Sequence, residues 1–169
     1  MGPHQGDDKL DWQYLMWIIR SFGFSNLWVE LVFHSICNVW FSTIINGKAT
    51  GFFRSSRGLK QDDPLSPALY IIVAEASSRN LQQVGSKVQN AYSTHSGYPA
   101  ITHHGYTDDI LVFCSGHKRA VRAIMGVLQD FKRVSGLEFS LSKSSVINGP
   151  SFLLAKRRSL TQITGFPTQ

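Results

Sequence analysis

The chain has 169 residues, the length of one ordinary domain, and its 43% hydrophobic residues against 17% charged ones supply enough apolar material for a core. Its 17 Lys and Arg residues against 11 Asp and Glu residues give a net charge of +6 (17 − 11), and the pI is about 9.6, which permits a polyanionic partner without identifying one. We expect no signal peptide, because the first ten residues are polar, and no membrane partner, because no apolar run is long enough to span a bilayer.

The first two expected elements are helices. Apolar residues recur at helical spacing from Leu10 to Phe22, and Gly23 is a typical stop. Ser25 is a typical N-cap for a second helix that runs to about Ile36. Because only a short turn joins them, the two helices should pack as a pair.

A hairpin is expected next. Residues from Val39 to Ile45 are mostly β-branched or aromatic, and Asn46-Gly47 follows them directly. This dipeptide is the strongest short-range signal for a two-residue hairpin turn, so the return strand should run from about Ala49 to Phe53.

A polar loop then leads into a third helix. The loop, residues 54–67, is dense in side chains that can hold a phosphate or a base, and an ordinary solvated loop is the alternative. Pro64 and Pro67 suit the first turn of a helix. The helix should end near Gly85, and residues 86–99 have the composition of a connecting loop.

Two adjacent aspartates, Asp108 and Asp109, lie at a bend in the segment from His104 to Phe113, between runs that are typical of strands. The pattern predicts a hairpin with the acidic pair at its tip. Two ionised carboxylates about 4 Å apart repel by roughly 4 kcal/mol at an effective dielectric constant of about 20, so the pair needs solvent, a counter-charge or a cation. Magnesium prefers such oxygen ligands. A solvated turn stays open as the alternative, because Asp is a common turn former.

The remaining elements are a helix, a strand and a helix. The amphipathic helix from Ala120 to Val134 carries a basic face, either solvated or in contact with nucleic acid, and Gly136 should end it. Alternating apolar residues predict a half-buried strand from Leu137 towards Ile147, and a short basic helix should span residues 153–163. The expected fold class is therefore α+β: a small antiparallel sheet of the acidic hairpin and this C-terminal strand, packed on helices, with the Asn-Gly hairpin in addition.

The two cysteines, Cys37 and Cys114, are far apart in apolar stretches and show no metal-ligand spacing. We expect two buried free thiols, which suit a reducing, intracellular setting. Nucleus and cytoplasm both stay open.

Three blocks of sequence, taken together, resemble one enzyme family. Residues 53–67 (FRSSRGLKQDDPLSP) are similar to a "RGLRQGDPLSP" block, and residues 106–109 (YTDD) are similar to "FADD" or "YADD". Residues 131–144 are similar to "F...SGL.IN..KS". In order and spacing the blocks resemble the reverse transcriptase domain of plant non-LTR (LINE-type) retrotransposons, and the resemblance covers nearly the whole chain.

The resemblance implies a polymerase palm and template-directed nucleotidyl transfer. It implies RNA template, DNA primer and deoxynucleoside triphosphates as partners, and magnesium as cofactor. Asp108 and Asp109 would be the catalytic metal ligands. The residues that would border the nucleotide or template are Arg57, Gln61, Ser66 and Lys143.

Three departures from the family pattern indicate a chain without activity. Counting back from Asp8-Lys9-Leu10-Asp11-Trp12, the family's third metal-binding aspartate falls at Gly2, which has no ligating side chain. Asp62 stands where the family has glycine, which adds bulk and negative charge beside a triphosphate. We also expect the fingers segment upstream and the thumb downstream to be absent, so that residues 1–169 form a partial, palm-centred domain.

Three interpretations follow from these residues. The first is an active polymerase. The second is a non-catalytic module that binds RNA or DNA with salt-sensitive affinity. The third, which the departures favour, is a translated relic without a selected function. The sequence does not decide the oligomeric state.

Overall fold

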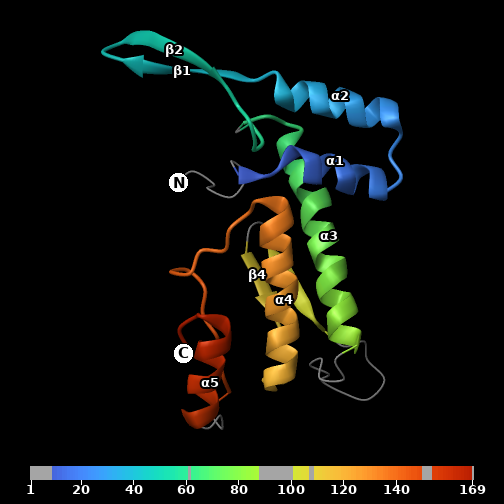
Figure 1. Ribbon diagram of the computed structural model, residues 1–169, viewed down its shortest axis with the longest axis vertical. Helices are drawn as coiled ribbons and strands as arrows, with labels where there is room; N and C mark the ends of the chain where they lie inside the picture. Colours follow the sequence, from blue (N-terminus) through green and yellow to red (C-terminus); the bar gives the residue numbers. More distant parts are fainter. Residues whose placement is uncertain (1–8, 61, 88–100, 107–108, 150–153, 169) are drawn as a thin grey trace. The chain divides into compact units, whose positions relative to one another are not determined.

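The computed structural model describes residues 9–60, 62–87, 101–106, 109–149 and 154–168. Helices and two small antiparallel sheets make up this part of the chain, so the predicted α+β class is confirmed (Figure 1). The chain divides into two compact units. The first comprises Met1–Glu75 with Val134–Leu137, and the second comprises Ala76–Arg133 with Glu138–Gln169.

The first unit begins with the expected pair of helices, α1 (Trp12–Ser21) and α2 (Asn26–Cys37). Helix α1 starts two residues after Leu10 because Asp11 caps it, its carboxylate accepting the N–H of Tyr14 at 2.9 Å. Ser25 caps α2 as predicted, accepting from the N–H of Trp28 at 3.3 Å. The buried apolar residues of the two helices are Leu15, Met16, Ile18, Ile19, Val29, Val32, Ile36 and Cys37.

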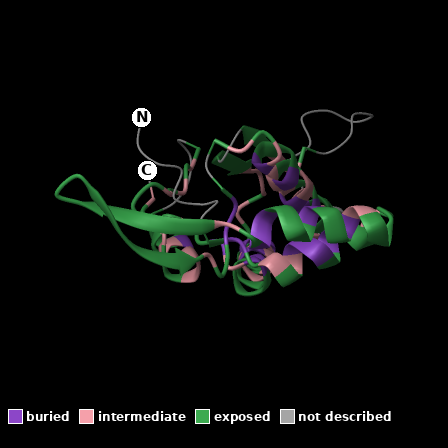
Figure 2. Ribbon diagram, turned by 90° about the horizontal axis from the view of Figure 1, so that it is seen from above, coloured by how far each residue is buried: buried purple, intermediate pink, exposed green. Residues whose placement is uncertain are grey.

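The Asn-Gly hairpin forms as predicted, from β1 (Trp40–Ile45) and β2 (Lys48–Arg54). Asn46 and Gly47 have φ angles of 49° and 76°, the left-handed values that a type I′ turn requires. All residues of both strands are exposed, as Figure 2 shows. The guanidinium of Arg54 fixes the base of the hairpin to the end of α2, donating to the carbonyl oxygen of Cys37 at 2.8 Å and to Asn38 Oδ1 at 3.0 Å.

Helix α3 (Ser66–Lys87) follows the polar loop and continues from the first unit into the second. Leu69 and Val73 are fully buried in its first half, and Leu81 is buried in its second half.

The second unit contains the acidic hairpin and the last two helices. The hairpin consists of β3 (His103–Tyr106) and β4 (Asp109–Val112), which pair antiparallel. Helices α4 (Lys118–Ser135) and α5 (Leu154–Thr164) match the two predicted C-terminal helices. The buried apolar residues of α4 and α5 are Ala120, Val121, Leu128, Phe131 and Leu160.

The predicted strand from Leu137 towards Ile147 is wrong. In the described residues it joins neither two-stranded sheet, and its only β-type pairing is an isolated bridge of Val146 to Thr168. Residues 141–143 turn instead, with the N–H of Lys143 and the hydroxyl of Ser144 both donating to the carbonyl oxygen of Ser140, at 3.1 and 2.8 Å. A strand needs a neighbouring edge for its N–H and C=O groups, and the alternating pattern alone does not supply one.

Both cysteines are free thiols; Cys37 is buried and Cys114 is half-buried. Among the residues that the structure describes, no helix combines the length and the apolar character needed to cross a bilayer.

Candidate active site

The acidic hairpin places Asp109 as the first residue of β4, opposite Tyr106 on β3. Only residues 107 and 108 connect the strands, so the predicted position of the acidic pair at the bend is consistent with the register. The Asp109 side chain is exposed. The other predicted ligand, Asp108, lies outside the described residues.

A network of hydrogen bonds holds this hairpin on α3. The hydroxyl of Ser78 lies 2.6 Å from Nε2 of His103, and the hydroxyl of Thr102 lies 2.9 Å from Nδ1 of the same ring. The N–H of Phe113 donates to the carbonyl oxygen of Thr102 at 2.9 Å and extends the pairing of the strands. A Cβ on Gly85 would clash with a methyl carbon of Thr102, so glycine permits the close approach of α3 to this segment.

The polar loop that precedes α3 has a defined conformation at its end. Oδ1 of Asp63 accepts the N–H of Leu65 at 2.8 Å, and the Asp63 carbonyl oxygen accepts the N–H of Ser66 at 3.1 Å. The buried hydroxyl of Ser66 donates to the carbonyl oxygen of Lys60 at 2.8 Å. The Ser66 side chain therefore closes the loop onto the start of α3, and its predicted contact with a nucleotide stays a prediction.

The same loop contains a residue in an unfavourable backbone conformation. Asp62 has a φ of 62°, in the left-handed region that favours glycine. This is the position where the resembling block has glycine. The backbone conformation thus gives a structural reason for glycine there, beside the room for substrate that the sequence suggests. Gln61, the neighbouring predicted site residue, lies outside the described residues.

The glycine of the Arg-Gly-Leu segment is anchored to the start of α1. The N–H of Gly58 donates to the carbonyl oxygen of Leu10 at 2.8 Å, and Nε1 of Trp12 donates to the carbonyl oxygen of Gly58 at 2.6 Å. Leu59, next in the chain, is buried. Arg57, the predicted nucleotide or template contact, is exposed, and its carbonyl oxygen accepts the Ser55 hydroxyl at 2.6 Å.

The Ser-Gly-Leu block contacts the same short segment of chain. The N–H of Asp11 donates to the carbonyl oxygen of Ser135 at 2.8 Å, and the fully buried Ser135 hydroxyl accepts the N–H of Leu137 at 3.1 Å. Gly136 has a φ of 75°, and a Cβ there would lie 2.6 Å from the carbonyl oxygen of Lys9. Two of the three blocks therefore meet at residues 9–12 through backbone groups, a structural role that their local sequence does not reveal.

The remaining predicted site residue, Lys143, is exposed and lies in the turn after Ser140. It belongs to the second unit, as does Asp109, whereas Arg57 and Ser66 belong to the first. Each unit thus carries part of the predicted set.

The described residues do not by themselves complete a metal centre. They contain no group of three or more His, Cys, Asp or Glu side chains arranged to hold an ion. Asp109 supplies one exposed carboxylate of the hairpin, which is less negative charge than two divalent cations need.

Comparison with known proteins decides the family. The family described as reverse transcriptase (RNA-dependent DNA polymerase) matches residues 5–164. The chain belongs to the reverse transcriptase family. This confirms the family to which the three sequence blocks point, and the matched range spans both units of the reverse transcriptase domain.

Two curated relatives are similar to parts of this reverse transcriptase domain. An uncharacterized mitochondrial protein of Arabidopsis thaliana is 38% identical over 79 residues, which cover 45% of this chain and 63% of the relative. The retrovirus-related Pol polyprotein from a type-2 retrotransposable element of Drosophila melanogaster is 26% identical over 126 residues, which cover 74% of this chain and 11% of the relative. The alignments thus span less than two thirds of either relative, and the second relative agrees with the retrotransposon resemblance of the blocks.

Proposed function

We propose that this reverse transcriptase domain is the palm-centred part of an RNA-directed DNA polymerase from a non-LTR retroelement. Its ancestral reaction is template-directed nucleotidyl transfer from a deoxynucleoside triphosphate to a DNA primer on an RNA template. The observation that carries the proposal is the family match over residues 5–164 together with a hairpin whose register leaves only residues 107 and 108 between its strands.

Within this proposal, Asp108 and Asp109 would hold magnesium, which would supply Lewis-acid chemistry at the primer hydroxyl and the leaving pyrophosphate. Arg57, Gln61, Ser66 and Lys143 contact the nucleotide or the template. Each assignment rests on the position of the residue in a family block.

We further propose that the polypeptide of residues 1–169 does not catalyse this reaction. Position 2, where the family pattern has its third aspartate, is glycine. Two carboxylates at one bend balance less of the charge of two divalent cations than three do. Asp62 adds a carboxylate where the family has glycine, next to the expected triphosphate.

Primer extension tests both statements. The 169-residue chain and its Asp108→Asn variant are incubated with an RNA template, an annealed DNA primer, deoxynucleotides and magnesium. We expect no extension product above the level of the variant. Extension by the unmodified chain that disappears in Asp108→Asn would contradict the proposed inactivity and confirm the catalytic role of this aspartate.

A second candidate is a non-catalytic module that binds RNA or primer–template. The net charge of +6 and the exposed Lys118, Arg119 and Arg122 on α4 favour it. Such binding depends on released counterions, so the affinity should fall steeply with salt. A fluorescence-anisotropy titration of a labelled RNA at about 50 mM and about 200 mM salt measures this fall. If no RNA binds at the lower salt, the binding module is excluded and the translated relic is the interpretation that stands.

A further inference from the structure

The last part of the chain carries positive charge without any acid. Glu138 is the last acidic residue, and residues 139–169 contain four cations, Lys143, Lys156, Arg157 and Arg158. This segment alone therefore contributes +4 to a net charge of +6.

Three of these cations lie at the end of a helix where positive charge is unfavourable. Lys156, Arg157 and Arg158 are the third to fifth residues of α5, and the first turn of this helix contains no acidic residue. The N-terminus of a helix carries a partial positive charge from its free N–H groups, so cations there lower its stability and an anion raises it. Helix α1 in the same chain has a carboxylate, that of Asp11, at its N-terminus.

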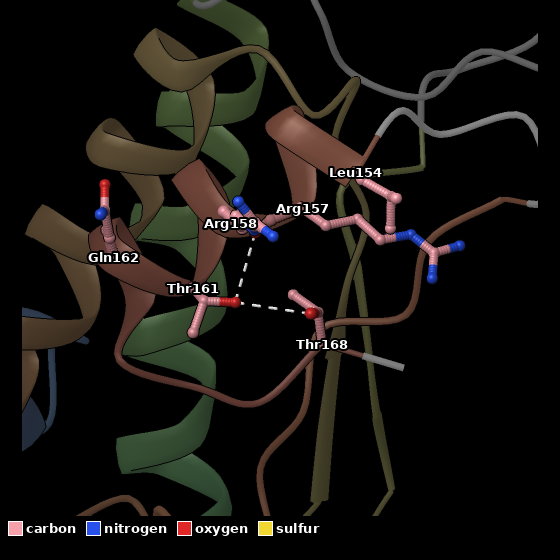
Figure 3. A pocket seen from close by; sticks show the side chains of 6 residues that line it. All are labelled: Leu154, Arg157, Arg158, Thr161, Gln162 and Thr168. Carbon is pink, nitrogen blue, oxygen red and sulfur yellow. Dashed lines mark hydrogen bonds between the residues drawn. The ribbon is translucent and has the colours of Figure 1, made fainter.

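A pocket of about 480 Å³ opens on this helix. Figure 3 shows the side chains that line it. Among the described residues, the polar side chains that line it are two guanidinium groups, two hydroxyls and one amide. Nε of Arg157 is buried and has no hydrogen-bond partner among the described residues. A buried donor without a partner is costly, and an acceptor from outside would satisfy it. The residues that line this α5 pocket are Leu154, Arg157, Arg158, Thr161, Gln162 and Thr168.

The backbone around the pocket is held in place. The hydroxyl of Thr161 donates to the carbonyl oxygen of Arg157 at 3.3 Å and contacts the Thr168 hydroxyl at 3.4 Å (Figure 3). The segment of Thr168 is tied to Val146 by an N–H···O bond of 2.8 Å from Val146 to the carbonyl oxygen of Pro167. Leu160 anchors α5, because only 3% of its surface is exposed. The backbone that carries the Arg157 and Arg158 side chains therefore needs little ordering when a ligand binds.

We propose that the α5 pocket binds a phosphate-type oxyanion through Arg157 and Arg158. A planar guanidinium presents paired N–H donors that match the geometry of phosphate oxygens. The ligand supplies an acceptor for Nε of Arg157 and negative charge beside the two guanidinium groups. The phosphate group comes either from a free anion or from a nucleic-acid backbone. The site is separate from Asp108 and Asp109 and does not depend on nucleotidyl transfer.

Titration of the ¹⁵N-labelled 169-residue chain with inorganic phosphate tests the site by NMR, with sodium chloride at matched ionic strength as reference. We expect saturable shifts of the Arg157 Nε–H signal and of the backbone amides of Arg158 and Thr161. Shifts that chloride reproduces, or no saturable shift, would overturn the proposal.

Two double variants with the same net charge distinguish phosphate binding at the α5 pocket from nonspecific attraction of phosphate to a positively charged chain. Replacing Arg157 and Arg158 by Gln should weaken phosphate binding by about tenfold or more, since charge-assisted hydrogen bonds are lost. Replacing the exposed Arg20 of α1 and Lys48 of β2 by Gln removes the same charge and should change the affinity less than about twofold. Equal weakening in the two double variants would overturn the proposal.

One further variant controls for folding, and one further ligand identifies the source of the phosphate. The Arg157→Lys variant keeps the charge but loses the guanidinium fork, so it should still fold by circular dichroism and bind phosphate more weakly. Undiminished phosphate binding by this variant would overturn the role of the Arg157 guanidinium.

A short single-stranded RNA distinguishes the two sources of phosphate. If the RNA shifts the same signals and competes with phosphate, the ligand is a backbone phosphate. If only phosphate shifts them, the ligand is a free anion; both outcomes support the site.

Discussion

The backbone N–H of Asp11 donates a hydrogen bond of 2.8 Å to the carbonyl oxygen of Ser135 and so joins the start of α1 to the end of α4. Its neighbour Leu10 accepts a second backbone bond, from Gly58. Two blocks that characterise the family by sequence thus converge on residues 9–12. Gly136 lets two backbones approach each other there, and Gly58 has a φ of 83°, so both residue types are explained without any contact with substrate.

The first prediction concerns Gly136, whose substitution by Ala should lower the free energy of unfolding by about 2 to 4 kcal/mol. Part of this cost is the left-handed φ of 75°, and the rest is the clash of the new Cβ with the Lys9 carbonyl oxygen at 2.6 Å. Urea unfolding followed by circular dichroism measures it. The control is Gly165→Ala, because Gly165 has a similar φ of 72° but nothing within 4 Å of a Cβ.

The control should cost only about 1 kcal/mol, the backbone term alone. The difference between the two substitutions therefore measures the contact with Lys9. Equal effects of the two substitutions would show that this contact contributes nothing to stability.

The second prediction concerns the loop before α3. Asp62→Gly should stabilise the chain by about 0.5 kcal/mol, because relief of the left-handed backbone exceeds the entropy that glycine adds to the unfolded state. Asp63→Gly should have the opposite sign and cost about 1 kcal/mol or more, because the bond from the Leu65 N–H to Oδ1 is lost. Chemical denaturation of both variants checks the signs, and a destabilised Asp62→Gly chain would contradict the prediction.

Local patterns predicted the elements whose cause is local. The Asn46-Gly47 turn depends on two residues that adopt positive φ, and the Ser25 cap depends on one hydroxyl and the helix that follows. Gly23 and Gly136 likewise follow α1 and α4 with positive φ. In each case a few neighbouring residues determine the conformation.

Features that depend on residues far apart in the sequence could not be predicted from local patterns. Alternating apolar residues after Leu137 are compatible with a strand, but the pairing partner has to come from another part of the chain, and Ser140 nucleates a turn instead. The contact of Gly136 with Lys9 is equally invisible to local patterns. At the candidate site, the hairpin around the acidic pair was predicted from its flanking residues, whereas the hydroxyl contact of Ser66 with Lys60 was not.

The third prediction concerns the hydrogen bond from Trp12 Nε1 to the carbonyl oxygen of Gly58. Trp12→Phe keeps an aromatic ring facing Phe33, with which Trp12 packs edge-on at a centroid distance of 6.4 Å, but removes the donor. We expect a loss of about 1 to 2 kcal/mol, since the half-buried bond is lost and the ring is smaller. Trp17→Phe is the matched control, because Trp17 is 62% exposed and should change stability by less than about 0.5 kcal/mol. Similar losses in both variants would contradict a specific role of the Gly58 bond.

The fourth prediction concerns Tyr14 on α1, where desolvation by burial raises the pKa of the phenol above its ordinary value. The folded state then keeps the proton at a pH at which the unfolded state has released it. The contribution of Tyr14 to stability is therefore fully present below the ordinary tyrosine pKa and is lost as the pH rises through the raised value. Urea unfolding of the unmodified chain and of Tyr14→Phe, from about pH 8 to about pH 11, isolates this effect from other titrating groups. The stability of the unmodified chain should fall more steeply with pH than that of the variant, and parallel curves would show that burial does not hold the phenol in its neutral form.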